Sequence, residues 1–117
     1  MVSAGGITGM WRLGRLIRGK DMAFVPHCFH TGIAVAATLH LLSAQPLNPP
    51  GIGPAFAYEP LLEYDRTDHP TREDLVRPLI SHDNGFVPVP AAPGLGITVQ
   101  RDVLARYTTT AETVATI

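Results

Sequence analysis

The chain has 117 residues, of which 45% are hydrophobic, so it has the length of one domain and enough apolar side chains for a core. Nine Lys and Arg residues against ten Asp and Glu give a formal net charge of -1, which excludes the strongly basic surface that binds nucleic acid or anionic lipid. A single cysteine excludes an internal disulfide framework and fits a reducing compartment, so we expect a cytoplasmic protein.

The first third of the chain predicts a helix followed by a buried strand. Residues 8–18 carry apolar side chains at helical spacing behind Thr8, a suitable N-cap, and a glycine stands where the helix should end. Residues 22–27 hold four apolar residues, a proline and His27, which is the pattern of a strand buried on both faces in a parallel sheet. Residues 1–6 lack the charged start and apolar run of a signal peptide.

A second helix and a second strand follow. Residues 31–44 predict a helix with a threonine N-cap, and this apolar window is far shorter than the roughly 20 residues that cross a bilayer. We therefore expect a buried helix and no membrane segment. A Pro/Gly-rich loop over residues 45–54 leads to a strand within residues 55–64, where Pro60 marks the start or a bulge and Glu63 lies at the exit.

This order of helix, strand, helix and strand is the alternation of an α/β fold with a parallel sheet. We expect residues 1–107 to form one unit and residues 108–117 a flexible tail. The elements expected after the second strand are one or two helical turns (71–76), a hairpin around Asn84-Gly85 (79–87), a loop (91–96) and a short helix (100–107).

Two successive strands thus end in side chains that can move protons. Because the carboxyl ends of parallel strands open on the same side, we expect His27 and Glu63 to face one mouth. An imidazole can take or return a proton near neutral pH, and a carboxylic group can hydrogen-bond developing charge, so the pair suits proton transfer. The alternative for His27 is a structural histidine held by hydrogen bonds.

Other polar residues nearby have weaker indications. Glu59 lies four residues before Glu63 and can share its rim, with a solvated role as the alternative. We interpret Cys28 as a packing or pocket-wall thiol and not as a nucleophile, because adjacency in sequence is not adjacency in space. His27, Cys28 and His30 lack a second ligand pair at zinc-site spacing, so we expect no metal site within this chain.

Four motifs in order resemble the C-terminal part of the mandelate racemase and muconate lactonizing enzyme family of the enolase superfamily. The resemblance covers about residues 4–107 and implies part of a (β/α)₈ TIM barrel: the last strands and helices, about the seventh and eighth strands, with a C-terminal hairpin and short helix. The motifs are Gly5-Gly6-Ile7-Thr8, Val25-Pro26-His27, Leu62-Glu63-Tyr64, and the run from Asn84-Gly85 through Val89-Pro90 to Pro93-Gly94-Leu95-Gly96-Ile97.

The resemblance implies a Mg²⁺-dependent enzyme that removes the proton α to a carboxylate. Its substrate is then a small carboxylate such as an acid sugar, and the reaction is a 2-hydroxy acid dehydration or, alternatively, a racemisation. By resemblance, His27 is the general acid/base and Glu63 binds the substrate carboxylate. Glu59 is the second choice for that anchor, and Cys28 lies in the substrate pocket.

The resemblance also assigns the metal-binding carboxylates, the second base and the substrate-reading domain to parts of the family's fold outside this chain. A complete barrel takes roughly 250 residues. We therefore expect a fragment that is inactive alone and that self-associates or is completed by a complementing chain. Alternatives from other classes are a non-enzymatic remnant or assembly module, and a stand-alone small α/β binding protein.

Overall fold

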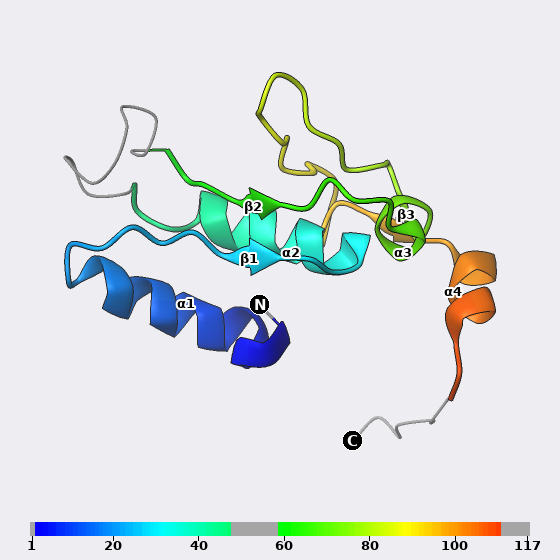
Figure 1. The fold of residues 1–117 in the computed structure, drawn as a ribbon, viewed down its shortest axis with the longest axis horizontal. Coiled ribbons are helices and arrows are strands. Elements are labelled where there is room, and N and C mark those ends of the chain that lie inside the picture. Colours follow the sequence, from blue (N-terminus) through cyan, green and yellow to red (C-terminus); the bar gives the residue numbers. More distant parts are fainter. Residues whose placement is uncertain (1, 48–58, 111–117) are drawn as a thin grey trace.

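A β–α–β unit forms the centre of the fold (Figure 1). Strand β1 (His27–Cys28) and strand β2 (Glu63–Tyr64) pair in parallel, and helix α2 (Gly32–Ser43) lies between them in the chain. The computed structural model describes residues 2–47 and 59–110. The α/β alternation with parallel pairing that the sequence predicted is therefore present.

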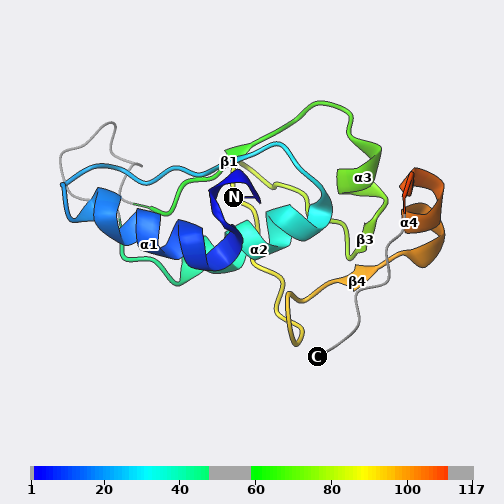
Figure 2. The same cartoon turned by 90° about the horizontal axis from the view of Figure 1, so that it is seen from below.

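Shorter elements flank this unit. Strands β3 and β4 pair antiparallel and form a separate two-stranded sheet. Helix α4 lies at the opposite end of the molecule from helix α1 (Figure 2). The bounds of these elements are η1, a 3-10 turn (Val2–Ala4), α1 (Gly6–Arg18), α3 (Pro70–Glu73), β3 (Val76–Arg77), β4 (Thr98–Val99) and α4 (Arg101–Tyr107).

Helix α1 begins earlier than the sequence predicted. Its N-cap is Gly5, at φ 79°, and Thr8 lies within the first turn, so the assignment of Thr8 as the N-cap is wrong. The left-handed conformation at the cap is easily reached only by glycine, which explains why the helix starts at the Gly5-Gly6 pair and not at the threonine. The helix ends at Arg18, as predicted.

The buried stripe of α1 is narrower than its apolar spacing indicated. Met10 and Ile17 pack in a cluster with Phe24 and with two leucines of α2, Leu41 and Leu42. Leu13 and Leu16, by contrast, are 39% and 62% exposed. Only part of the predicted apolar face is therefore buried against the rest of the described chain.

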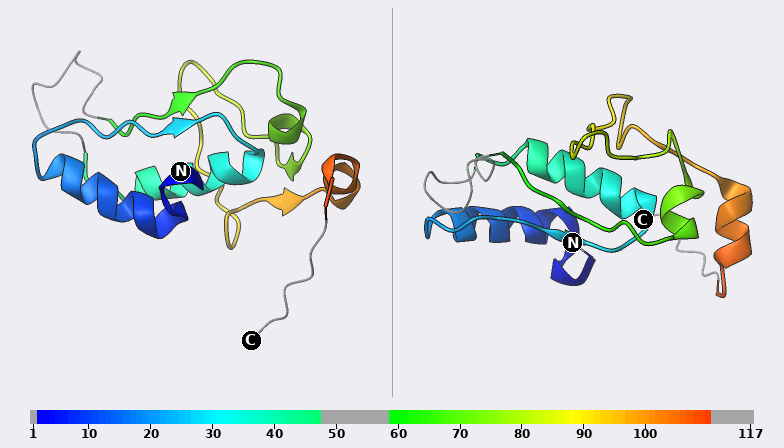
Figure 3. Two further views of the ribbon diagram at one scale, coloured as in Figure 1. Left: turned by 60° about the horizontal axis from the view of Figure 1, so that its bottom comes forward. Right: turned by 45° about the horizontal axis from the view of Figure 1, so that its top comes forward.

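The first strand is shorter than expected, and only one of its faces is buried. Regular pairing is limited to the two residues of β1. Phe24, Pro26 and Cys28 are buried, whereas Val25 is 45% exposed and Phe29 is 47% exposed. The prediction of a strand buried on both faces is wrong, because α1 and α2 both lie on the same side of the strands (Figure 3, left).

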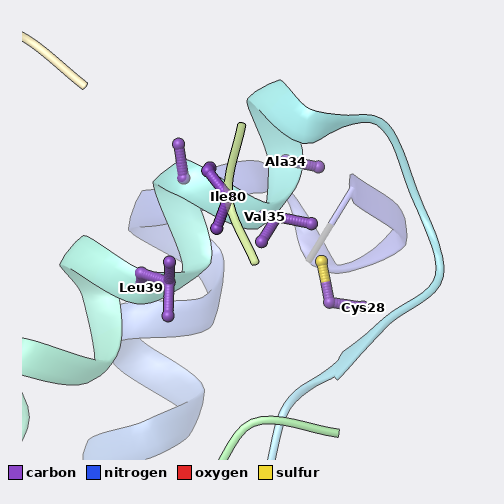
Figure 4. Close-up of a cluster of buried hydrophobic side chains, with 6 residues drawn as sticks. Cys28, Ala34, Val35, Leu39 and Ile80 are labelled. Atoms are coloured by element: carbon purple, nitrogen blue, oxygen red, sulfur yellow. The ribbon is translucent and has the colours of Figure 1, made fainter. Parts of the chain in front are cut away.

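Helix α2 is the buried helix that the sequence predicted. Thr31 caps it, with its hydroxyl oxygen accepting a hydrogen bond from the backbone N–H of Ala34 at 3.4 Å. Full burial of a side chain the size of Val or Leu stabilises a fold by about 1.5–3 kcal/mol. This helix thus supplies a large part of the core shown in Figure 4, whose buried members are Cys28, Ala34, Val35, Ala36, Leu39 and Ile80.

The chain after β2 keeps the predicted turn but not the predicted hairpin strands. Asn84 and Gly85, at φ 48° and 86°, form a tight turn closed by a bridge between Asp83 and Phe86. The flanking residues do not continue as paired strands, and β3 pairs with the distant β4 instead. Three prolines in these flanks cannot donate a hydrogen bond to a ladder: Pro78, Pro88 and Pro90.

The two short predicted helices are found with shifted ends. The turns expected over 71–76 form α3, and the helix expected over 100–107 forms α4, which starts one residue later behind Gln100. Most of the predicted loop over 45–54, the start of the predicted strand within 55–64 and residues 111–117 of the predicted tail lie outside the described residues. In the part of the chain that is described, no helix has the length and apolar character needed to traverse a lipid bilayer.

Candidate functional site

The structure brings His27 and Glu63 into direct contact. The two residues are register partners in the parallel β1–β2 ladder, so their side chains leave the strands on the same face. His27 Nδ1 lies 2.8 Å from Glu63 Oε2, within hydrogen-bond distance. Both side chains are more than half exposed, at 57% and 55%. The sequence predicted that His27 and Glu63 lie close together, because each stands at the end of one of two parallel strands.

Local backbone and ring contacts hold the pair in this geometry. The backbone N–H of Glu63 donates to the carbonyl oxygen of Pro26 at 3.2 Å, which fixes the register one residue before the histidine. The ring of Phe29 lies against the imidazole of His27, with centroids 4.2 Å apart. Phe29 is two residues beyond His27 and therefore projects from the same face of the chain.

The hydrogen bond to Glu63 assigns different roles to the two ring nitrogens. Since Nδ1 contacts the carboxylate, Nε2 is the nitrogen left to exchange a proton with another molecule. A carboxylate bonded to Nδ1 favours the tautomer with its proton on Nδ1, which makes Nε2 the basic nitrogen. The arrangement therefore leaves Nε2 as the nitrogen that can accept a proton from another molecule.

Cys28 faces the opposite side of the strand from His27. Its side chain is 1% exposed and belongs to the core cluster on α2 (Figure 4). The hydroxyl of Thr38 lies 3.6 Å from the Cys28 sulfur and also donates to the carbonyl of Ala34 at 2.7 Å. The structure thus places this thiol in packing with α2 and not beside the histidine.

Glu59 also lies apart from the His27–Glu63 pair. It lines a cavity of about 710 Å³ between α2, the approach to β2 and the segment around the Asn84-Gly85 turn. Neither His27 nor Glu63 lines this cavity. Its polar lining residues, beside the apolar ones, are Ser43, Glu59, Tyr64, Arg66, His82 and Asn84.

A buried ion pair begins shortly after Glu63 along the chain, and the sequence analysis did not predict it. Asp65 and Arg72 are both 5% exposed, and Arg72 Nη1 lies 2.9 Å from Asp65 Oδ2. Arg72 also donates to the backbone carbonyl of Thr67 and to the carboxylate of Glu73. These contacts tie the chain leaving β2 to helix α3. The local signal is the Asp-x-Thr spacing of a side-chain turn immediately after the strand.

The surroundings of Asp65 favour its ionised form. The pKa of Asp65 is lowered first by the hydrogen bond from the backbone N–H of Thr67, then by the hydroxyl of the same residue. Burial raises the pKa, and the positive charges of Arg72 and His69 lower it further. The hydrogen bonds prevail over the cost of burial.

Comparison with known proteins identifies the class to which this fold and site belong. The family model described as enolase C-terminal domain-like matches residues 1–103. The chain therefore belongs to that family, and the resemblance drawn from the four motifs is confirmed.

The most similar relatives include three enzymes. The chain is 33% identical over 107 residues to D-galactarolactone cycloisomerase of Agrobacterium fabrum, covering 92% of this chain and 28% of the relative. It is 30% identical to arabinonate dehydratase of Saccharolobus solfataricus, covering 88% and 24%. It is 29% identical to o-succinylbenzoate synthase of Bacillus subtilis, covering 90% and 26%. The chain thus spans only about a quarter of the length of these relatives.

A solved structure supports the same assignment. The crystal structure of 3,6-anhydro-D-galactonate cycloisomerase from Zobellia galactanivorans matches with a TM-score of 0.68 and 33% sequence identity. The match covers 89% of this chain and 26% of that chain. The arrangement of the described elements is therefore that of one part of a larger enzyme fold.

The described residues do not form a metal centre on their own. Within residues 2–47 and 59–110, no group of three or more His, Cys, Asp or Glu side chains is close enough to hold a metal ion. Glu63 is the one described carboxylate in contact with His27, whereas a magnesium site takes several oxygen ligands in octahedral geometry.

Proposed function

We propose that this chain supplies the acid/base part of an enolase-type active site that moves the proton α to a carboxylate. The observation that carries the proposal is the contact of 2.8 Å between His27 Nδ1 and Glu63 Oε2 at register partners of a parallel pair. In this proposal, Nε2 of His27 exchanges the proton with the substrate, and Glu63 holds the imidazole in the required orientation.

The substrate class follows from the relatives. One relative acts on a galactarolactone and another on arabinonate, which are a sugar lactone and a sugar acid. We assign this chain to an enzyme of the same kind, most closely a dehydratase of a 2-hydroxy sugar acid. A racemase starts with the same proton abstraction, but no relative described above carries that name.

The chain would not perform this reaction alone. It spans about a quarter of each relative, and its described residues do not form a magnesium site. Any Mg²⁺ in the complete family fold would supply charge stabilisation for the substrate carboxylate, and the described residues by themselves do not provide its ligand set. We therefore expect no turnover by the isolated polypeptide.

A chimera tests the proposal. Residues 1–103 of this chain replace the matched stretch of the Agrobacterium cycloisomerase, and exchange of the substrate α-proton is followed by NMR in D₂O. Exchange that His27→Asn abolishes supports the proposal. Exchange that survives His27→Asn, or turnover by the isolated chain, contradicts it.

Variants of the two glutamates refine the role of Glu63. A positioning role toward His27 predicts that Glu63→Gln lowers kcat, whereas binding of the substrate carboxylate predicts a higher KM. Glu59→Gln is the matched control, because Glu59 lines the cavity that His27 and Glu63 do not reach. An effect of Glu59→Gln as large as that of Glu63→Gln would reverse the assignment of the anchor.

A further inference from the structure

The contact between His27 and Glu63 does not by itself fix the orientation of the imidazole. Both side chains are more than half exposed, at 57% and 55%, so water competes for the ring nitrogens and for the carboxylate. An exposed pair gains little from its Coulombic attraction, and side-chain entropy opposes the paired arrangement. A second contact is therefore needed to keep Nδ1 of the histidine at the carboxylate.

The ring of Phe29 supplies this second contact. Its centroid lies 4.2 Å from the centroid of the imidazole, and the two ring planes are tilted by 37°. Phe29 stands two residues after His27, so both side chains leave the extended chain on the same face. A phenyl ring has no hydrogen-bonding atom, so it shields one face of the imidazole from water without competing for either ring nitrogen.

Packing in the core does not account for the position of Phe29. The side chain is 47% exposed and belongs to none of the three hydrophobic clusters that the described residues form. Its backbone, however, is anchored on both sides. Cys28 before it is buried in the core, and Thr31 after it caps α2. The ring therefore stands on a fixed piece of backbone while its face contacts the histidine.

We propose that Phe29 is the positioning residue of the acid/base pair. Its ring holds the imidazole of His27 so that Nδ1 stays at Glu63 and Nε2 remains available to another molecule. The role of this positioning in catalysis rests on the proposed function, which assigns proton exchange to Nε2. The positioning itself is a property of this chain and can be measured without a substrate.

Val25 offers a matched comparison on the same face of the chain. Burial alternates from Phe24 to Phe29, and Val25 stands two residues before His27 as Phe29 stands two residues after it. Val25 is 45% exposed, nearly as much as Phe29, but it has no ring to stack on the imidazole. Val25→Ala and Phe29→Leu therefore change apolar side chains at symmetric positions, and only the second removes the ring contact.

The tautomer of His27 is the readout in the full chain. Nitrogen-15 NMR at a pH where the ring is neutral reports the ratio of the Nδ1–H to the Nε2–H form, and His27→Asn assigns the signals. We expect mainly the Nδ1–H form in the native chain. Phe29→Leu should lower the ratio by about two- to tenfold. Phe29→Tyr, which keeps the ring, and Val25→Ala should leave the ratio unchanged.

Three results would overturn the proposal. The first is an unchanged tautomer ratio in Phe29→Leu, and the second is an equal change in Val25→Ala. The third is loss of the dispersed backbone amide spectrum in Phe29→Leu, which would show that this ring supports the fold and not the imidazole alone. A changed ratio with an intact amide spectrum, recovered in Phe29→Tyr, supports the proposal.

The chimera with the Agrobacterium cycloisomerase separates this inference from the proposed function. Positioning predicts that Phe29→Leu lowers kcat by about ten- to a hundredfold with little change in KM, and that Phe29→Tyr recovers the rate. A raised KM with an unchanged kcat would mean that Phe29 binds substrate, and it would contradict the proposal. A chimera without exchange that depends on His27 contradicts the proposed function, while the tautomer ratio in the full chain still decides the role of Phe29.

Discussion

Arg72 and Asp65 form an ion pair with 2.9 Å between Nη1 and Oδ2 while both side chains are almost fully buried. The pair lies directly after β2, and the same guanidinium binds the backbone of Thr67 and the carboxylate of Glu73. The exit of the strand that carries Glu63 is therefore fixed by a single arginine.

Replacing this arginine should destabilise the fold. We expect Arg72→Leu to leave the buried carboxylate of Asp65 uncompensated and to lower the Tm by on the order of 10 °C. Thermal unfolding followed by circular dichroism measures the change. Arg66→Leu is the matched control, because Arg66 is exposed and its replacement should shift the Tm little. Equal shifts for both variants would show that the ion pair does not stabilise the structure.

The lowered pKa of Asp65 predicts how stability depends on acid. Because the pKa in the folded state lies below the ordinary value of 3.8, ionised Asp65 contributes stability above that value. The contribution is lost as the pH falls through the folded-state pKa. We expect urea midpoints to decline below pH 3.8 more steeply for the native chain than for Asp65→Asn. Asp68→Asn, at an exposed neighbour, should retain the native slope.

A side chain larger than that of glycine does not fit at Gly32, because α2 approaches β3 closely at this position. A Cβ at this position would lie 2.4 Å from Val76 Cγ2 and 2.7 Å from the backbone oxygen of Arg72. We expect Gly32→Ala to lower the free energy of unfolding by about 1–3 kcal/mol, despite the better helix propensity of alanine. Gly19→Ala is the comparison, since Gly19 has φ −66° and more distant neighbours. A stabilising Gly32→Ala would contradict this packing.

The His27–Glu63 pair should contribute to chemistry and little to stability. Both side chains are more than half exposed, and exposed ion pairs contribute at most about 1 kcal/mol. We expect His27→Asn and Glu63→Gln to change the unfolding free energy by less than that in urea titrations. A larger loss of unfolding free energy in either variant would mean that the pair stabilises the fold. This is the structural role that was the alternative for His27.

Arg18 presents the opposite case, a cation that the described chain does not pair. Its guanidinium nitrogens are buried without a hydrogen-bond partner among the described residues, and burial lowers its pKa. The ring of Phe24 lies 5.9 Å away. We expect Arg18→Leu to raise the Tm, since an apolar side chain removes the cost of desolvating the charge. Arg15→Leu, at an exposed position of α1, should not raise the Tm.

The sequence could predict those features whose signal is local or follows from chain order. Thr31 caps α2, and Asn84-Gly85 forms a tight turn, because each needs only a few adjacent residues. The contact between His27 and Glu63 could be anticipated because parallel strands end on the same side. These inferences required no knowledge of packing between distant elements.

Other features depend on what the rest of the fold places nearby. The start of α1 was missed because Thr8 and Gly5 both resemble helix starts, and only the backbone conformation decides between them. The apolar run ending at Val25 does not reveal whether one or two faces are covered. The pairing of Asp65 with Arg72 requires α3 to fold back toward β2, which no spacing in the sequence specifies.

The parallel ladder has a consequence for deletions. Side chains alternate along a strand, so a slip of one residue would turn Glu63 toward α2 and present Leu62 or Tyr64 to the imidazole. Removing a single residue between Pro60 and Glu63 would therefore erase the carboxylate partner of His27 while sparing every acidic residue in the chain.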